Sequence, residues 1–169
     1  MTEQMSVKIA ALPSLRLTVE AHGLLAKKAL GQNFLLDQNI TDKIINLSLQ
    51  KQNKKDFSGA NVFEVGPGPG GLTRAVLAAE PKSLTVVEMD ERCIAIMNEI
   101  KEKTGDILHI INGDAMQIDF SVLAPAPRHI ISNLPYNISV PLLVGWLKNI
   151  NAYDLSLIHI SEPTRPLYI

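Results

Sequence analysis

The 169-residue sequence contains a single cysteine, Cys93, and its longest apolar runs are short. One cysteine cannot form an internal disulfide or a zinc site, and a membrane helix needs about 20 consecutive apolar residues. The first twelve residues include Glu3 and Lys8, so a secretory leader with a charged start and an apolar run is not expected. These absences predict a cytoplasmic globular protein that has no membrane association and no metal site.

The net charge is also small, at −1, but it is unevenly distributed along the chain. Residues 1–60 carry eight Lys or Arg against five Asp or Glu, whereas residues 61–154 carry seven against eleven. Lysines in the first part could contact phosphates, because such contacts give affinity that is independent of nucleotide sequence. They could equally form a solvated surface, so charge alone leaves both interpretations open. The lysines concerned are Lys27, Lys28, Lys51, Lys54 and Lys55.

From Asn61 onward, short β-rich runs alternate with segments of helical periodicity. This alternation predicts an α/β domain with a mainly parallel sheet. Strands are expected at 61–65, 83–87, 107–111 and 129–132. Helices are expected at 72–79, 91–103 and 140–150.

Two further predictions concern a proline within one of these helices and an additional helix. Pro141 is expected in the first turn of the 140–150 helix, where proline is tolerated. An amphipathic helix at 37–49 is expected ahead of the sheet, with Asp37 as its N-cap. Its apolar side would carry Ile40, Ile44, Ile45 and Leu47.

A glycine-rich loop, E-V-G-P-G-P-G-G, follows the first predicted strand at 64–71. Gly66, Gly68 and Gly71 match the G-x-G-x-x-G pattern of dinucleotide-binding proteins. A pyrophosphate, however, is bound by backbone N–H groups, and Pro67 and Pro69 have none. The loop therefore suits a ligand that approaches the backbone closely without a diphosphate, such as S-adenosylmethionine.

Acidic residues follow the next two predicted strands. Glu88 could accept hydrogen bonds from both hydroxyls of a ribose, and Asp114 from the amino group of an adenine. Like the glycine loop, both fall at carboxyl ends of strands, where open α/β sheets bind ligands. Each could instead be an ordinary loop acid that caps a helix. Three such positions in the correct order favour adenosine binding.

The fourth predicted strand leads into Asn133-Leu134-Pro135-Tyr136, which we interpret as a rigid catalytic loop. The Asn133 side-chain oxygen and the Leu134 carbonyl could accept the hydrogens of an adenine amine, so that the nitrogen lone pair points at a sulfonium methyl. Pro135 would stiffen the loop, and Tyr136 would stack on a flipped-out base, a contact worth about 1–3 kcal/mol. The alternative is a turn with an asparagine cap and a buried tyrosine.

With these residues assembled, the chain resembles the KsgA-type family of rRNA adenine N6-dimethyltransferases, which act on 16S rRNA. The resemblance implies a Rossmann-like class I S-adenosylmethionine-dependent methyltransferase fold, here incomplete, with an N-terminal helical arm. It also implies dimethylation of two adjacent adenines near the 3′ end of small-subunit rRNA, on a pre-30S particle and by a monomer. Four blocks carry it: Gly31–Leu35, Glu64–Gly71, Val87–Glu88 with Gly113–Met116, and Asn133–Ser139.

The resemblance further implies roles for individual residues. Catalytic roles fall on Asn133, Leu134, Pro135 and Tyr136. Contacts to the cofactor S-adenosylmethionine fall on Gln32, Asn33, Leu35, Glu64, Gly66, Gly68, Glu88, Asp114, Ala115 and Asn133.

The chain is expected to divide into an arm at 1–60, a methyltransferase core at 61–154 and a tail at 155–169. The tail begins L-S-L-I-H-I-S-E-P-T-R and looks like the translation of a sequencing adapter, so we expect it to be non-native. The family's C-terminal helical RNA-binding domain is expected to be absent. We therefore expect this chain to be inactive by itself, and to aggregate because one sheet edge lacks protection.

Two other functions remain open on the sequence alone. One is a non-catalytic assembly factor that uses the fold to hold rRNA, against which the intact 133–136 segment argues. The other is an NAD-dependent oxidoreductase, suggested by the glycine spacing. Pro67, Pro69 and the 133–136 segment argue against this second alternative.

Overall fold

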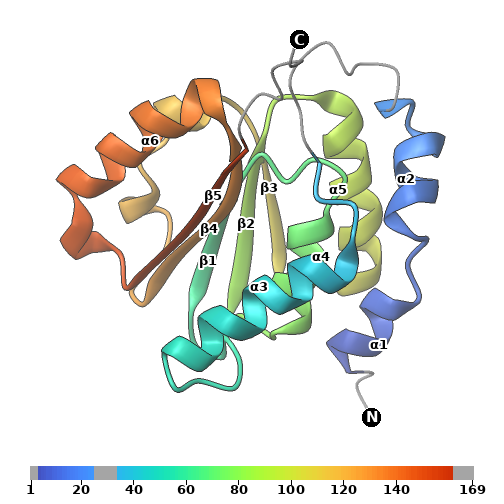
Figure 1. The fold of residues 1–169 in the computed structure, drawn as a ribbon, viewed down its shortest axis with the longest axis horizontal. Coiled ribbons are helices and arrows are strands. Elements are labelled where there is room, and N and C mark those ends of the chain that lie inside the picture. Colours follow the sequence, from blue (N-terminus) through green and yellow to red (C-terminus); the bar gives the residue numbers. More distant parts are fainter. Residues whose placement is uncertain (1–3, 25–33, 162–169) are drawn as a thin grey trace, which may run out of the picture.

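A parallel sheet forms the centre of the molecule. The computed structural model describes residues 4–24 and 34–161, and within them five strands pair in the order β3-β2-β1-β4-β5 (Figure 1). Every adjacent pair is parallel. The strands are β1 (Asn61–Val65), β2 (Ser83–Glu88), β3 (Leu108–Asn112), β4 (Arg128–Pro135) and β5 (Leu155–Ser161). The predicted parallel α/β fold is confirmed, and β5 adds a strand within the segment expected to be non-native.

Helices cover both faces of this sheet. Figure 1 shows α6 on one face and α3, α4 and α5 on the other, with α1 and α2 outside them. In the described part of the chain, no helix is both long enough and apolar enough to cross a bilayer. The helices are α1 (Met5–Ala10), α2 (Leu15–Ala21), α3 (Gln38–Lys51), α4 (Gly71–Ala78), α5 (Glu91–Thr104) and α6 (Tyr136–Lys148). Short 3-10 turns are η2 (Ala115–Gln117), η3 (Phe120–Val122) and η4 (Ile150–Ala152).

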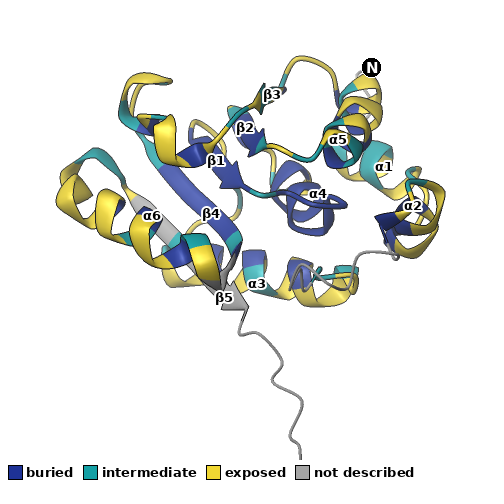
Figure 2. Cartoon of the chain, turned by 90° about the horizontal axis from the view of Figure 1, so that it is seen from above, coloured by how far each residue is buried: buried dark blue, intermediate teal, exposed yellow. Residues whose placement is uncertain are grey.

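The sheet is buried from both sides, as a parallel sheet with crossover helices must be. All five residues of β1 are buried (Figure 2). Val62 belongs to the apolar cluster that contains α4 and α5, whereas Phe63 and Val65 belong to the cluster beneath α6. Trp146 of α6 packs in this second cluster, edge-on to Phe120. The alternation along β1 therefore fills two cores from one short strand.

The N-terminal arm is attached to α4 through an arginine. Val19 and Leu24 are buried in the same apolar cluster as α4 and α5. Arg74 of α4 is also buried, and it donates to the Pro13 carbonyl at 2.6 Å and to the Thr18 hydroxyl at 3.2 Å. The arm thus contributes to the core of the sheet domain. It is also held by the buried guanidinium of Arg74, through these two hydrogen bonds.

The predicted helix at 37–49 is confirmed as α3, but its apolar side is only partly right. The N-cap prediction holds, since the Asp37 carboxylate accepts the Asn39 N–H at 2.9 Å. Ile45 is buried, whereas Ile40 and Leu47 are each 49% exposed. The buried face is completed by Thr41, Ser48 and Leu49.

Polar residues on the buried face of α3 explain this error. The Thr41 hydroxyl donates to the Gln38 carbonyl at 2.9 Å, so Thr41 is buried without losing a hydrogen bond. A prediction based on apolar residues assigns such polar positions to the solvent side. The predicted buried face of α3 was therefore turned about the helix axis from the observed one.

The segment 133–139 is not a loop, which corrects the prediction. β4 continues through Pro135, and α6 begins at the next residue, Tyr136. Pro141 consequently lies inside α6 and not in its first turn. Asn and Pro favour turns in general, but Leu134 is fully buried in the core and carries the strand further.

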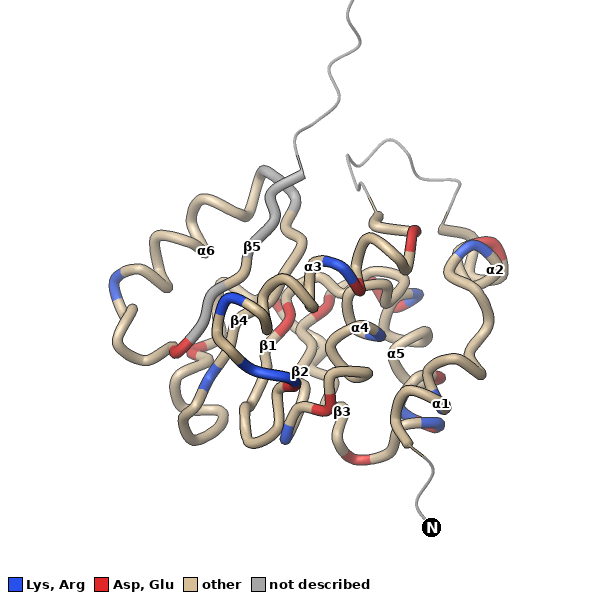
Figure 3. The backbone as a smooth tube through the Cα atoms, turned by 60° about the horizontal axis from the view of Figure 1, so that its bottom comes forward, with Lys and Arg blue, Asp and Glu red and all other residues tan. Residues whose placement is uncertain are grey.

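Three of the five lysines noted in the sequence are described by the structure, and they lie near the amino ends of the strands. Lys27 and Lys28 lie outside the described residues. Lys51 ends α3, and Lys54 and Lys55 lie in the turn that leads to β1 (Figure 3). The amino edge of the sheet is opposite the carboxyl edge, where open α/β sheets bind ligands.

One side of α6 presents apolar side chains to solvent. Val140, Val144 and Leu147 of α6 and Ile150 of the following η4 are each about half exposed and recur at helical spacing. Monomeric proteins rarely expose a contiguous apolar stripe of this kind. The stripe supports the expectation that this chain aggregates, which stays a prediction.

His129 of β4 is a buried polar residue that makes no side-chain hydrogen bond within the described part of the chain. It is fully buried, packs edge-on against Phe57, and neither ring nitrogen has a hydrogen-bond partner among the described residues. Burial lowers the pKa of His129 below its ordinary value of 6.5, and the positive charge of Lys54 adds to this effect.

Replacing His129 with leucine is expected to raise the free energy of unfolding at pH 7 by about 1–3 kcal/mol, because an unsatisfied buried group is removed. The wild-type chain should lose stability as the pH falls below 6.5, since the unfolded chain then binds a proton that folded His129 resists. Urea unfolding at pH 5 and pH 8 measures both effects. The control His109→Leu removes an exposed imidazole of β3. A loss below pH 6.5 that is equal in His129→Leu and the wild type would contradict this account.

Candidate active site

A cavity of about 290 Å³ lies at the carboxyl ends of β1, β2 and β4. The chain runs from β1 to β2 on one side, while β4 pairs with β1 on the other side. This reversal of strand order is the switch point at which open α/β sheets bind ligands. Of the residues expected to hold the cofactor, those that line the cavity are Leu35, Glu64, Gly66, Gly68, Glu88, Asp114, Ala115 and Asn133.

The opening between β1 and β4 has a local cause. The register of the two strands ends at the pair Phe63 and Ile130. Beyond this pair, the Val65 N–H donates to the Ser132 hydroxyl at 2.9 Å, in a buried contact. A side chain thus replaces the next ladder bond, and the strand ends part just where the glycine loop and Asn133 begin.

The glycine loop is in close contact with the residues that precede α3. A Cβ at Gly68 would lie 2.8 Å from the Phe34 ring, and Gly68 has a φ of +54°. A Cβ at Gly71 would lie 2.4 Å from the Leu35 carbonyl oxygen. These glycines are therefore required by the protein's own chain. Phe34 and Leu35 both line the cavity, and Phe34 was not predicted.

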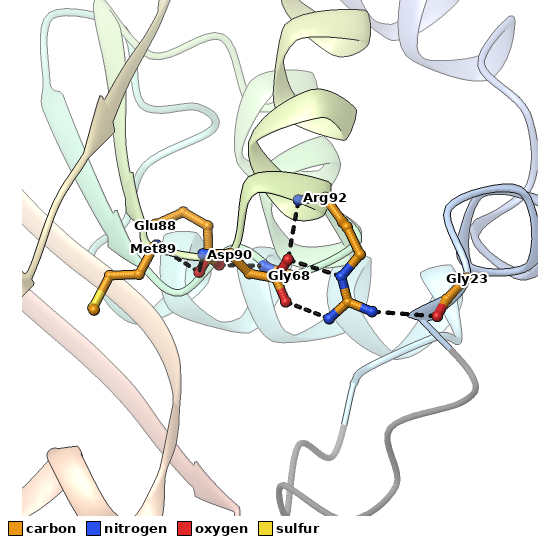
Figure 4. Close-up of polar contacts among 6 residues, drawn as sticks. All are labelled: Gly23, Gly68, Glu88, Met89, Asp90 and Arg92. Carbon is orange, nitrogen blue, oxygen red and sulfur yellow. Dashed lines mark hydrogen bonds and ion pairs between the residues drawn. The ribbon is translucent and has the colours of Figure 1, made fainter.

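Glu88 lies at the end of β2 and is held by its own backbone. Its Oε1 accepts the N–H groups of Met89 at 2.8 Å and Asp90 at 2.9 Å (Figure 4). Its Oε2 accepts the Gly68 N–H at 3.4 Å. The carboxylate therefore joins the end of β2 to the glycine loop, and its orientation at the cavity is fixed.

Asp114 both caps a turn and lines the cavity. Its carboxylate accepts the Met116 N–H at 2.9 Å and forms the N-cap of η2. The capping interpretation thus applies to Asp114. It does not apply to Glu88, because the N-cap of α5 is Asp90.

Asp90 connects the cavity to the N-terminal arm. Arg92 donates through Nε to Asp90 at 2.9 Å, and through Nη1 to the Gly23 carbonyl at 3.3 Å (Figure 4). Asp90 itself lines the cavity. A second contact joins the arm to α5, since His22 and Glu99 approach to 3.0 Å.

Glu64 is the acidic residue that lies deepest in this region. It is 1% exposed, lines the cavity, and accepts a hydrogen bond from the Thr73 hydroxyl of α4 at 2.8 Å. Burial raises the pKa of Glu64 to about 8, and repulsion from Glu88 acts in the same direction, whereas the Thr73 hydrogen bond lowers it. At neutral pH this carboxyl is mainly protonated.

Carboxyl groups dominate the electrostatics of the cavity. Among its described lining residues, Glu64, Glu88, Asp90 and Asp114 are acidic, and none is Lys, Arg or His. Cys93 also lines it, and burial raises the pKa of its thiol to about 12. The cavity therefore suits a positively charged ligand and opposes a diphosphate.

Several lining residues were not among the individual site residues expected from the sequence. They include Met89, Asp90, Cys93 and Leu142, together with Phe34, Met116 and Ile138, which lie in the blocks that carry the resemblance but were given no role of their own. The two methionines are exposed apolar side chains at the cavity. Their signal was available in the sequence, because Met89 follows the acid that ends β2 and Met116 lies two residues after Asp114.

The residues expected to be catalytic are only partly visible in the cavity. Asn133 lines it, at the end of β4. The Leu134 side chain is fully buried in the core under α6, so only its backbone could meet a ligand. The backbone places Pro135 at the end of β4 and Tyr136 at the start of α6. Gln32 and Asn33, expected at the cofactor, lie outside the described residues.

Comparison with solved structures identifies the fold. The 23S rRNA methyltransferase ErmE superposes with a TM-score of 0.55 at 24% identity, over 75% of this chain and 47% of that one. The Podospora anserina methyltransferase PaMTH1, solved with S-adenosylhomocysteine, gives a TM-score of 0.54 at 16% identity, over 88% and 65% of the two chains. The fold is that of class I S-adenosylmethionine-dependent methyltransferases, as predicted.

Comparison of sequences identifies the family. Residues 23–167 match the family model described as ribosomal RNA adenine dimethylase. The chain is 50% identical over 144 residues to the ribosomal RNA small subunit methyltransferase A of Gluconobacter oxydans, a match that covers 85% of this chain and 46% of the relative. The chain therefore belongs to the ribosomal RNA adenine dimethylase family, which confirms the resemblance.

The matches cover most of this chain but only part of each relative. The chain spans about half the length of the curated relatives it matches. The family match reaches residue 167 and so includes most of the segment expected to be non-native. The origin of residues 155–169 stays a prediction.

Substituting Gly71 with alanine is expected to lower the free energy of unfolding by about 1–3 kcal/mol, because the new methyl group would displace the Leu35 backbone. The matched control is Gly145→Ala inside α6, where an added Cβ meets nothing within 4 Å. That substitution should stabilise the chain by about 0.5–1 kcal/mol. Urea unfolding compares them, and effects of the same sign would contradict the close contact at Gly71.

Replacing Glu64 with glutamine should remove a pH-dependent loss of stability. The folded-state pKa of Glu64 is raised, so stability is highest below the unfolded value of 4.5 and falls as the pH rises toward 8. The stability of Glu64→Gln relative to the wild type should therefore grow by roughly 3 kcal/mol between pH 5 and pH 8. Denaturant unfolding at both pH values measures this, and a constant difference would contradict the raised pKa.

Proposed function

We propose that this chain is the cofactor-binding part of an rRNA adenine N6-dimethyltransferase that acts on small-subunit rRNA. The observation that carries the proposal is an acid-lined cavity at the strand switch point with Asn133 at its edge. Membership in the ribosomal RNA adenine dimethylase family supports the same reaction. The small-subunit substrate is supported by the name of the 50% identical relative.

The residues of the cavity fit S-adenosylmethionine. Its sulfonium and ammonium groups are cations, and four carboxyl groups line the cavity without a described basic residue. Glu88 and Asp114 would receive the ribose and the adenine, and Gly66 and Gly68 would allow close approach of the ligand. When bound, this cofactor supplies an activated methyl group on sulfur. The two phosphates of NAD would instead meet the carboxyl groups, which disfavours an oxidoreductase.

Asn133 would position the target amine. Its side-chain oxygen and the Leu134 carbonyl would accept the two hydrogens of the exocyclic amine, so that the nitrogen lone pair points into the cavity. The bond between the Val65 N–H and the Ser132 hydroxyl fixes the strand directly before Asn133. Tyr136 would provide a stacking surface for the flipped base. Methyl transfer then depends on position and fixed dipoles, without a strong general base.

The remaining partners follow from the family. The substrate would be small-subunit rRNA in a pre-30S particle in the cytoplasm, with the protein acting as a monomer and without a metal. Recognition of the two adenines would require the half of the relatives that this chain does not cover. A non-catalytic assembly factor would use the same surface but would have no need of Asn133.

Calorimetric titration tests cofactor binding directly. S-Adenosylmethionine should bind the purified chain, and Asp114→Ala should weaken binding about tenfold, because one hydrogen bond to the adenine is worth about 1–1.5 kcal/mol. NAD, titrated in parallel, should not bind. Circular dichroism confirms that each sample is folded. Binding of NAD in preference to S-adenosylmethionine by a folded sample would reject the methyltransferase in favour of the oxidoreductase.

A methyl-transfer assay tests the expected inactivity of the chain. With labelled S-adenosylmethionine and small-subunit particles as substrate, the chain should transfer no label to rRNA above background, since it spans about half the length of the relatives it matches. Transfer above background would reject this expectation. If transfer occurs, Asn133→Ala should abolish it, and retention of the signal in that variant would reject the role proposed for Asn133.

A further inference from the structure

Glu64 differs from the other acids of the cavity in its burial. Glu88 and Asp90 are partly exposed and Asp114 is exposed, whereas Glu64 is 1% exposed. Its carboxyl points toward α4, where the Thr73 hydroxyl donates to Oε2. It is thus a buried titratable group that nevertheless borders an open cavity.

Within residues 4–24 and 34–161, the groups that face Glu64 from neighbouring elements supply no positive charge. Arg74, next to Thr73 on α4, donates to the Pro13 carbonyl and the Thr18 hydroxyl. Arg92 of α5 pairs with Asp90. The titratable groups that share the cavity with Glu64 come from β2, the turn before α5, α5 and the turn after β3, and they are Glu88, Asp90, Cys93 and Asp114.

An ionised Glu64 would therefore be a buried charge without a counter-ion, which is costly. This is why the pKa of Glu64 is raised to about 8 and the carboxyl is mainly neutral at pH 7. A cation that entered the cavity would reverse the balance, since it would favour the carboxylate.

We propose that Glu64 is a proton-linked counter-ion, neutral in the empty cavity and ionised when the cationic cofactor is bound. This inference rests on the proposed function for the identity of the ligand. On binding, the O–H bond of the Glu64 carboxyl breaks, the proton passes to the solvent buffer, and the carboxylate pairs with the positive charge of the ligand. The empty cavity thereby avoids an uncompensated buried charge, and the filled cavity gains an ion pair.

The number of protons released on binding tests the proposal. It is obtained by titrating S-adenosylmethionine into the chain in phosphate and in Tris, because the two buffers differ in ionisation enthalpy. With a pKa of about 8, Glu64 should release about 0.9 proton at pH 7 and about 0.1 at pH 9. Below pH 8, the affinity should rise with pH by up to about tenfold per unit.

Two variants locate the source of the proton. Glu64→Gln has the shape of the neutral carboxyl, and it should bind without the release seen at pH 7. The difference between wild type and Glu64→Gln cancels any proton that the ligand's own amine exchanges. Cys93→Ala removes the other lining group with a raised pKa, and proton release should persist in this variant.

Each outcome has a distinct meaning. Binding by the wild type without proton release at pH 7, or with release equal to that of Glu64→Gln, would overturn the proposal. Loss of release in Cys93→Ala alone would also overturn it. If Glu64→Gln does not fold, the ionisation of Glu64 in the wild type, followed by NMR of its carboxyl carbon with and without S-adenosylmethionine at pH 7, decides the question, and a carboxyl in the same protonation state in both samples would overturn the proposal. No binding by a folded wild type would reject the proposed function, which is distinguishable from binding without proton release.

Discussion

The junction between β1 and β4 is the constraint on which the rest of the structure depends. The two strands pair through only three residues each, and a serine hydroxyl then takes the place of the next ladder bond. Because the strand ends part here, the glycine loop and Asn133 face the same space. A longer ladder would close this space. The helices on the two faces of the sheet bury this short junction, since residues of β1 belong to both apolar clusters.

Most of the fold could be predicted from the sequence, because the strands are short β-rich runs separated by helical periodicity. Their bounds were right to within about three residues, and the parallel arrangement was confirmed. The errors arose where tertiary contacts override local preference. Leu134 is buried and extends β4 through residues that favour a turn. Thr41 is buried because its hydroxyl bonds to the helix itself, so apolar periodicity misplaced the buried face of α3.

The site was predictable to the extent that it follows strand ends. Glu88, Asp114 and Asn133 line the cavity, where they were expected because each comes directly after or at the end of a β-rich run. Phe34 could not be found this way, since it precedes α3 and contacts the glycine loop from a part of the chain that is distant in sequence. The protonation of Glu64 was also beyond the sequence, because it depends on which charges fold against it.

Two of the contacts that hold the N-terminal arm do not depend on the side chains of the arm. Arg74 and Arg92 donate to the main-chain carbonyls of Pro13 and Gly23, and a carbonyl is present whatever side chain the residue carries. At these two contacts the identity of the arginines on α4 and α5 is required, whereas the arm supplies only backbone. The positions of the arm that evolution would hold fixed are instead those whose side chains are buried or bonded, among them Thr18, Val19, His22 and Leu24.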